Sequence, residues 1–301
     1  MKLGNLWIYQ KERFPLARTV PLLAVFSAAS ISVSAQLAGR PLPSGWGFLA
    51  AFVTALLIFF QMRVCDEFKD LDADRRFRPD RPIPRGLISL RAVMGLGVLS
   101  LPLTALAAGA WHPPLLWLLG VVWVWLALMT AEFGVPAWLG ARPVLYLVSH
   151  MAIMPLIDLL LTAFEWMPGG GPAAALALFL ALSFVNGCVL EIGRKIWAPQ
   201  SEIAGVESYS ALWGPGRAAW VWAVFVALSF GILMALAVLT DAVAVALPAG
   251  GAGAVACAVA AWRHARAPTI ATEKRLDLLA GLWVFLCYAL AGFAPILTGM
   301  F

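Results

Sequence analysis

Long apolar runs recur along the whole chain, and they constrain the fold more than any other feature of the sequence. A helix needs about 18 or more mostly apolar residues to cross roughly 30 Å of hydrocarbon. Nine such runs predict an all-α fold, a polytopic membrane helix bundle of about nine transmembrane helices. The predicted spans are residues 19–37, 47–65, 88–109, 114–132, 142–163, 172–192, 217–239, 243–262 and 276–299.

The composition excludes a soluble globular protein. Hydrophobic residues make up 62% of the chain and charged residues only 12%, and the mean hydropathy is +0.87. Soluble domains are far less apolar than this. No linker, short repeat or low-complexity tract divides the chain, so residues 1–301 are expected to form a single transmembrane domain.

The basic residues predict how the bundle is oriented. Lysine and arginine accumulate in the short loops on the cytoplasmic side of a membrane. If the N-terminus lies in the cytoplasm, all of the 21 Lys and Arg except Arg40 fall in cytoplasmic segments. We therefore expect an integral protein of the bacterial inner (plasma) membrane, with its N-terminus and the two longest polar loops in the cytoplasm. The net charge of +5 is then a topology signal, and no nucleic-acid partner is predicted.

The first long loop, residues 66–86, reads DEFKDLDADRRFRPDRPIPRG and begins with a series of carboxylates. Positions four apart on a helix differ by only about 40°, so Asp66, Asp70 and Asp74 are expected to form one stripe, with Glu67 beside it. Carboxylates crowded in this way repel one another unless a cation sits among them. Carboxylate oxygens are ligands that Mg²⁺ prefers, and Mg²⁺ often completes its shell with substrate phosphate oxygens. The pattern predicts a magnesium and diphosphate site.

Arginines follow directly, on a segment stiffened by three prolines between residues 79 and 84. Their forked donors match phosphate oxygens. The predicted diphosphate-binding residues of this loop are Arg75, Arg78, Arg81 and Arg85. An ordinary solvated loop is the plain alternative, but carboxylates that begin inside an apolar helix are costly without a function.

These residues resemble the first signature of the UbiA superfamily of intramembrane prenyltransferases, Asn-Asp-x-x-Asp-x-x-x-Asp followed by Arg-Pro-x-Pro-x-Gly. The matching residues are Asp66, Glu67, Asp70, Asp74 and the segment RPIPRG at 81–86. Asp66 stands where the family commonly has Asn, and Glu67 where it has Asp, and both keep oxygen ligands. The resemblance implies nine helices, a Mg²⁺ cofactor, and transfer of an isoprenyl group from a prenyl diphosphate to a hydrophobic or aromatic acceptor.

The second long loop departs from the family's second signature, which is Asp-x-x-x-Asp after the sixth helix. Glu191 matches the first acid, but Lys195 reverses the charge of the second. In one interpretation, Glu191 and Glu202 hold a second metal ion while Arg194 and Lys195 bind the diphosphate as fixed cations. In the other, the altered loop marks a different acceptor or a lost activity.

Three polar residues inside predicted spans complete the candidate site. Asp158 lies within a membrane helix, where an ionisable group is costly unless it has partners or a function, and we expect it to orient an acceptor or take its proton. His150, near the same helix face, has either that role or a packing role. Asn186 is expected to reach the diphosphate from the sixth helix. The predicted catalytic residues are thus Asp66, Asp70, Asp74, Asp158 and Glu191.

Two other functions stay open at this point. A terpene cyclase of the same superfamily would use a double bond of the substrate as the nucleophile and need no acceptor. A membrane transporter would place its charges near the middle of the membrane, whereas here they gather in two loops.

Overall fold

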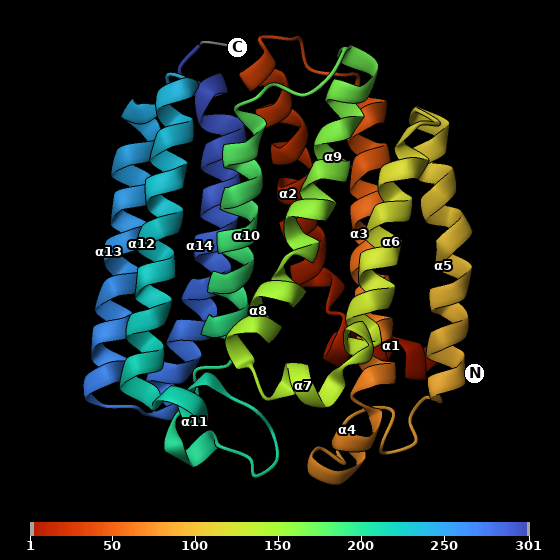
Figure 1. Ribbon diagram of the computed structural model, residues 1–301, viewed down its shortest axis with the longest axis vertical. Coiled ribbons are helices and arrows are strands. Elements are labelled where there is room, and N and C mark those ends of the chain that lie inside the picture. Colours follow the sequence, from red (N-terminus) through yellow and green to blue (C-terminus); the bar gives the residue numbers. More distant parts are fainter. Residues whose placement is uncertain (1–2, 300–301) are drawn as a thin grey trace.

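The computed structural model describes residues 3–299, and every secondary-structure element in that range is a helix (Figure 1). The helices of the apolar bundle are α2 (Leu16–Ala38), α3 (Gly45–Lys69), α5 (Leu90–Trp111), α6 (Leu115–Thr130), α8 (Pro143–Met151), α9 (Ile153–Gly169), α10 (Leu176–Gly193), α12 (Pro215–Leu239), α13 (Val243–Arg266) and α14 (Ile270–Leu297), of which α8 and α9 together make one span. The short ones are α1 (Leu3–Arg13), α4 (Leu71–Phe77), η1 (Glu132–Gly134), α7 (Pro136–Gly140), η2 (Pro199–Ser201) and α11 (Tyr209–Trp213).

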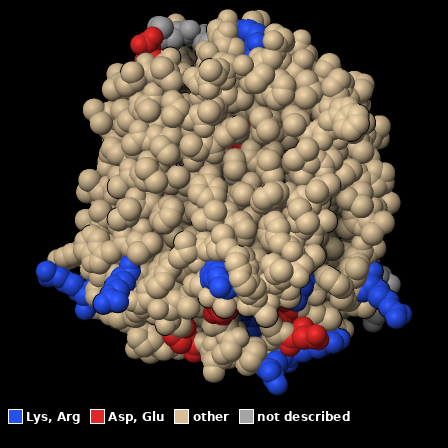
Figure 2. Space-filling view, in the orientation of Figure 1, with Lys and Arg blue, Asp and Glu red and all other residues tan. Residues whose placement is uncertain are grey.

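The nine-span prediction is confirmed in the described residues. Eight helical segments are long and apolar enough to cross a membrane, and α6 is a shorter apolar helix of 16 residues. At about 1.5 Å per residue α6 spans about 24 Å. On the face shown in Figure 2, the middle of the bundle is almost free of charged residues, as contact with lipid favours.

The fifth predicted span, residues 142–163, differs from the expectation because it is broken. It consists of α8 and α9, which meet at Ala152 and change direction there (Figure 1). Pro155 lies in the first turn of α9. Its ring has no N–H and clashes with the carbonyl four residues before it, so the helix cannot continue straight through Met151. The break sets the direction of α8, which carries Tyr146 and His150.

Basic residues gather at one end of the bundle (Figure 2). This is the end at which α4, α7 and α11 lie (Figure 1), and we call it the basic end. Both long polar loops, between α3 and α5 and between α10 and α12, belong to it. The sequence therefore folds so that its two candidate motifs lie at the same end of an apolar bundle.

The opposite end has one buried ion pair, which explains the single arginine predicted there. Arg40 donates from Nε and Nη2 to the Glu165 carboxylate at 2.6 and 3.0 Å, and to the carbonyl of Gly171 at 2.9 Å. The Ser34 hydroxyl donates to the same carboxylate at 2.6 Å. These contacts tie the end of α2 to the end of α9.

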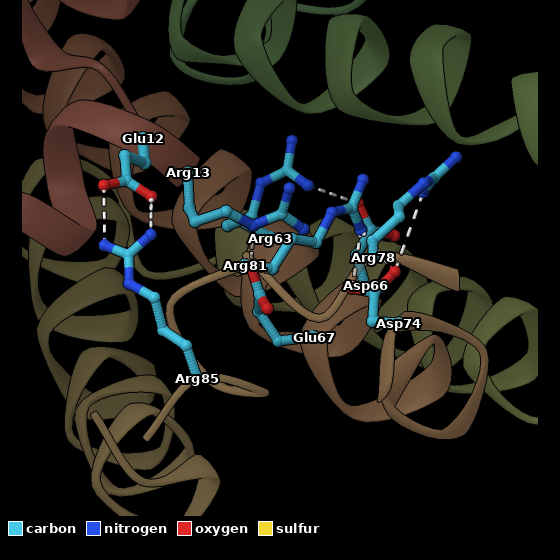
Figure 3. A network of polar contacts seen from close by, with 9 residues as sticks. All are labelled: Glu12, Arg13, Arg63, Asp66, Glu67, Asp74, Arg78, Arg81 and Arg85. Atoms are coloured by element: carbon cyan, nitrogen blue, oxygen red, sulfur yellow. Dashed lines mark hydrogen bonds and ion pairs between the residues drawn. The ribbon is translucent and has the colours of Figure 1, made fainter. Parts of the chain in front are cut away.

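Two ion pairs fix the course of the first long loop, one within the loop and one to α1 (Figure 3). Arg81 donates to both oxygens of the buried Asp74 carboxylate, at 2.7 and 2.5 Å. Arg85 forms a two-pronged pair with Glu12 of α1, at 3.0 and 2.8 Å. Charge-assisted bonds of this kind fix orientation as well as distance, so the loop has a defined course over the basic end.

Replacing Arg40 should destabilise the bundle, because the Glu165 side chain is only 3% exposed and would be left as an uncompensated charge. We expect Arg40→Ala to lower the free energy of unfolding by about 2 to 4 kcal/mol. Thermal unfolding in detergent, followed by tryptophan fluorescence, would show a lower midpoint. Adding Glu165→Gln should recover part of the loss, and an unchanged midpoint in the single variant would contradict the assignment.

Replacing Arg81 should loosen the part of the first long loop that follows α4, because its ion pair with Asp74 is lost. We expect Arg81→Ala to raise the rate of tryptic cleavage after Arg85 about ten-fold or more, because opening the loop no longer breaks a charge-assisted hydrogen bond. Arg81 precedes a proline and is not itself a tryptic site, so the cleavage map stays simple.

The matched control for this loop is Arg75→Ala. Arg75 is 63% exposed and meets only Asp72, at 3.5 Å. Equal cleavage rates in the two variants would show that the Arg81 contact does not hold the loop.

Candidate active site

The two long loops meet at the basic end. Gly205 of the second loop has a φ of +82°, and a Cβ placed on it would lie 2.2 Å from the Phe77 ring of α4. Only glycine permits both that backbone conformation and so close an approach. The charges of Asp66 on α3 and Arg194 after α10 also interact. The two loops, which the sequence places on one side of the membrane, therefore contact each other in the structure.

Two carboxylates at the end of α3 keep oxygen atoms available. The Asp66 side chain is 50% exposed and pairs loosely with Arg63, at 3.3 Å. Asp70 is half-buried at the C-terminus of α3, and it forms no ion pair among residues 3–299. These two acids have the free lone pairs that a cation requires.

The other two carboxylates of the predicted stripe are already compensated (Figure 3). Glu67 is buried and accepts from Arg13 of α1 at 2.5 Å. Asp74 is buried and paired with Arg81. The Asp70 and Asp74 N–H groups still donate to the Asp66 and Asp70 carbonyls, as in a continuous helix, but the Glu67 and Asp74 side chains pair with arginines that periodicity does not reveal. Their predicted roles as metal ligands stay predictions.

The residues present fit a metal ion only in part. Within residues 3–299 no three His, Cys, Asp or Glu side chains converge closely enough to form a complete metal site. Mg²⁺ characteristically uses one or two carboxylates and takes its other ligands from water and phosphate. Asp66 and Asp70 fit that pattern, and their role as metal ligands stays a prediction.

In the second loop, Glu191 lies between two cations. Arg194 pairs with one of its oxygens at 2.5 Å and Lys195 with the other at 2.9 Å. The charge of Glu191 raises the pKa of Arg194 above its usual value. Tyr209 is buried nearby, and burial, followed by the charge of Glu191, raises the pKa of its hydroxyl, so Tyr209 stays neutral.

Two further predicted residues have other partners in the structure. Glu202 accepts from the Ser208 hydroxyl with both oxygens, at 2.7 and 2.8 Å. Asn186 is 1% exposed and accepts from Ser229 of α12 at 2.7 Å. These contacts place Asn186 in the core and Glu202 within its own loop, and their predicted contacts with a metal ion and a diphosphate stay untested.

Among the four arginines of the first loop that are predicted to bind diphosphate, Arg78 has the weakest contact with an acid in the fold. It is 26% exposed and meets Asp74 only at 3.7 Å. Burial lowers the pKa of Arg78, and the charge of the neighbouring Arg81 lowers it further, while the charges of Asp74 and then Asp70 act in the opposite direction. An anion bound beside Arg78 would therefore stabilise its charged form.

A polar cluster lies beside Asp66, and sequence reasoning singled out only His150 among its members. Lys69 pairs with Glu132 at 2.9 Å and donates to the Tyr146 hydroxyl. His150 stacks on the Tyr146 ring, with 3.9 Å between ring centroids. Besides His150, the sequence signal was the pair of charges Lys69 and Glu132, which are also ordinary for a loop.

A small cavity of about 30 Å³ lies against this cluster. It is lined by Met62, Cys65, Asp66, Lys69, Leu126, Met129, Thr130 and His150. The cavity joins a carboxylate to an apolar wall, and at about this volume it has room for a single water molecule.

Asp158 lies apart from any accessible surface. It is fully buried, and its oxygens accept from Ser30 of α2 at 2.6 Å and from Tyr288 of α14 at 2.7 Å. These bonds join three helices and satisfy the carboxyl group. In this structure Asp158 has no surface on which to touch a substrate, and its catalytic role stays a prediction.

Comparisons with known proteins agree with this arrangement. The model of the UbiA prenyltransferase family matches residues 24–286. Comparison with curated proteins finds no match.

Two solved structures share the fold. The apo structure of a UbiA homolog from Aeropyrum pernix K1 has a TM-score of 0.68 at 15% identity, covering 92% of this chain and 98% of that one. A structure of a digeranylgeranylglyceryl phosphate synthase has a TM-score of 0.58 at 14% identity, covering 96% and 99%. At such identities the likeness concerns the fold, and the family follows from the sequence match, which spans most of the chain: the protein belongs to the UbiA prenyltransferase family.

Proposed function

We propose that the protein transfers an isoprenyl group from a prenyl diphosphate to a hydrophobic or aromatic acceptor, in a reaction that depends on Mg²⁺. The observation that carries this proposal is the pair of available carboxylates, Asp66 and Asp70, at the basic end of an apolar bundle. Incompletely compensated Arg78 interacts with Asp70, and Arg194 interacts with Asp66. One of the structural neighbours is named as a digeranylgeranylglyceryl phosphate synthase, which is consistent with a lipid-like acceptor.

The chain's own residues would bind and stabilise the leaving group. Asp66 and Asp70 would hold Mg²⁺, which when bound neutralises negative charge on the diphosphate. Arg78 and Arg194 would donate to phosphate oxygens as the carbon–oxygen bond breaks and its electron pair passes to the diphosphate. The allylic carbon then becomes electron-poor, and the acceptor's nucleophile bonds to it and loses a proton.

The apolar side of the cavity would receive the prenyl chain. Its lining includes Met62 and Met129, whose unbranched side chains adapt to irregular shapes. Because the cavity is only about 30 Å³, these side chains must move when a substrate enters. An apolar wall at this place keeps water from capturing the electron-poor carbon.

His150 is the group we propose to face the acceptor. Its Nδ1 lies 3.0 Å from the Tyr146 carbonyl, which can only accept a hydrogen bond, so Nδ1 carries the proton. The other ring nitrogen, Nε2, is then unprotonated and lies 3.4 Å from the Lys69 ammonium. Beside the cavity, this pair can orient a hydroxyl or acidic acceptor.

The basic end is proposed to face the cytoplasm of a bacterial inner membrane, because Lys and Arg concentrate there (Figure 2). The water-soluble diphosphate product would then be released on that side.

Product analysis of the detergent-solubilised protein tests this function. Geranyl, farnesyl and geranylgeranyl diphosphates would be supplied with Mg²⁺, with and without aromatic acceptors and a lipid extract. We expect acceptor-dependent release of diphosphate together with a new prenylated mass. Asp70→Asn should reduce the rate at least about 100-fold, because it removes charge stabilisation of the transition state.

Asp72→Asn is the matched control, since Asp72 lies in the same loop but is 96% exposed. We expect its activity to stay within about two-fold of the unmodified protein, as for most surface substitutions. Release of a hydrocarbon or terpene alcohol without any acceptor would instead identify a cyclase. Equal losses in the two variants would refute the assignment of Asp70.

A further inference from the structure

The charge reversal at Lys195 changes what the second loop can bind. The family pattern has acids at both positions, four residues apart. Here Glu191 and Lys195 form an ion pair at 2.9 Å, and Arg194 pairs with the same carboxylate at 2.5 Å. Both Glu191 oxygens therefore already have a cationic partner.

This loop does not fit a metal ion. A protonated lysine has no lone pair to offer, and a divalent cation beside Glu191 would lie against two positive side chains. Glu202, the other acid predicted for this role, directs both oxygens to Ser208. Across the described range, 3–299, no cluster of three or more His, Cys, Asp or Glu side chains that could hold a metal ion includes either acid.

The same residues fit a phosphate group. The Lys195 side chain is 30% exposed and the Arg194 side chain 50% exposed. Lysine has three N–H donors and arginine five, so both retain donors after pairing with Glu191. The backbone carbonyl of Lys195 accepts from the Tyr209 N–H at 3.0 Å, which fixes the second loop beside it.

Formal charges show that the exchange loses no positive charge. The formal charges of two acids and of the one Mg²⁺ that they hold sum to zero. Without any metal, the formal charges of Glu191, Arg194 and Lys195 sum to +1. A diphosphate at this place would therefore meet at least as much positive charge as in the family pattern.

We propose that this chain binds its diphosphate substrate with one divalent ion, at Asp66 and Asp70, and that Lys195 and Arg194 occupy the place of a second. Glu191 is a positioning residue that holds both cations toward the site. The inference rests on the proposed function, because it concerns the same diphosphate.

Counting metal ions tests the proposal without any catalysis. The probes are Mn²⁺ and inorganic diphosphate, added to the full chain in detergent. Dialysis equilibrium would give Mn²⁺ per protein-bound diphosphate, and electron paramagnetic resonance would show whether the bound ions are isolated or spin-coupled. We expect one Mn²⁺, with the six-line spectrum of an isolated ion.

Two substitutions sharpen the test. Lys195→Gln should keep one Mn²⁺ per diphosphate but weaken diphosphate binding ten-fold or more. Lys195→Asp recreates the acid spacing of the family and should admit a second, spin-coupled Mn²⁺. Arg217→Gln is the control, because Arg217 is exposed at the start of α12 and should change neither quantity.

The outcomes separate the two proposals. Two spin-coupled Mn²⁺ ions in the unmodified protein would overturn the one-metal inference and leave the proposed function standing. Failure of the protein to bind either diphosphate or Mn²⁺ would overturn the proposed function, and the inference would fall with it. The count on the unmodified protein decides the question even if Lys195→Asp does not fold.

Discussion

Charge compensation is the constraint on which the rest of this structure depends. An ionised group at the edge of an apolar bundle is poorly hydrated, and it persists only with a partner. Arg40 and Glu165 satisfy this rule at one end of the bundle. At the basic end Glu67 pairs with Arg13, and Asp74 with Arg81. The Arg13–Glu67 pair also holds α1 against α3, and the Arg81–Asp74 pair fixes the course of the first long loop.

The fold was predictable because its signal is local. Each span is a long apolar run, and neither hydropathy nor the clustering of Lys and Arg requires knowledge of distant contacts. The break between α8 and α9 was missed for a related reason. Pro155 lies inside an apolar run, and membrane helices tolerate prolines where neighbouring groups satisfy the freed carbonyls. Hydropathy alone does not distinguish a kinked span from a straight one.

The candidate site was predictable only in outline. Helical periodicity places Asp66, Asp70 and Asp74 around a single helix axis, but it does not show what approaches from elsewhere. The partner of Glu67 is 54 residues away in sequence, and the partner of Arg85 is 73 residues away. Both lie on α1, a short helix that the prediction did not include among its elements. Motif spacing therefore located the site, while tertiary contacts decided which of its acids are available.

Whether a carboxylate already has a partner in the fold also distinguishes acids with a structural role from acids that can bind a ligand. Asp158 is satisfied by Ser30 and Tyr288, and its burial is accounted for without any substrate. Asp70 has no such partner among the described residues, although it lies in a motif rich in arginine. The other four acids between residues 66 and 74 each have an arginine partner, so the one carboxylate there without a partner indicates where a cation belongs. Arg78, whose charge is only partly offset, indicates in the same way where an anion belongs.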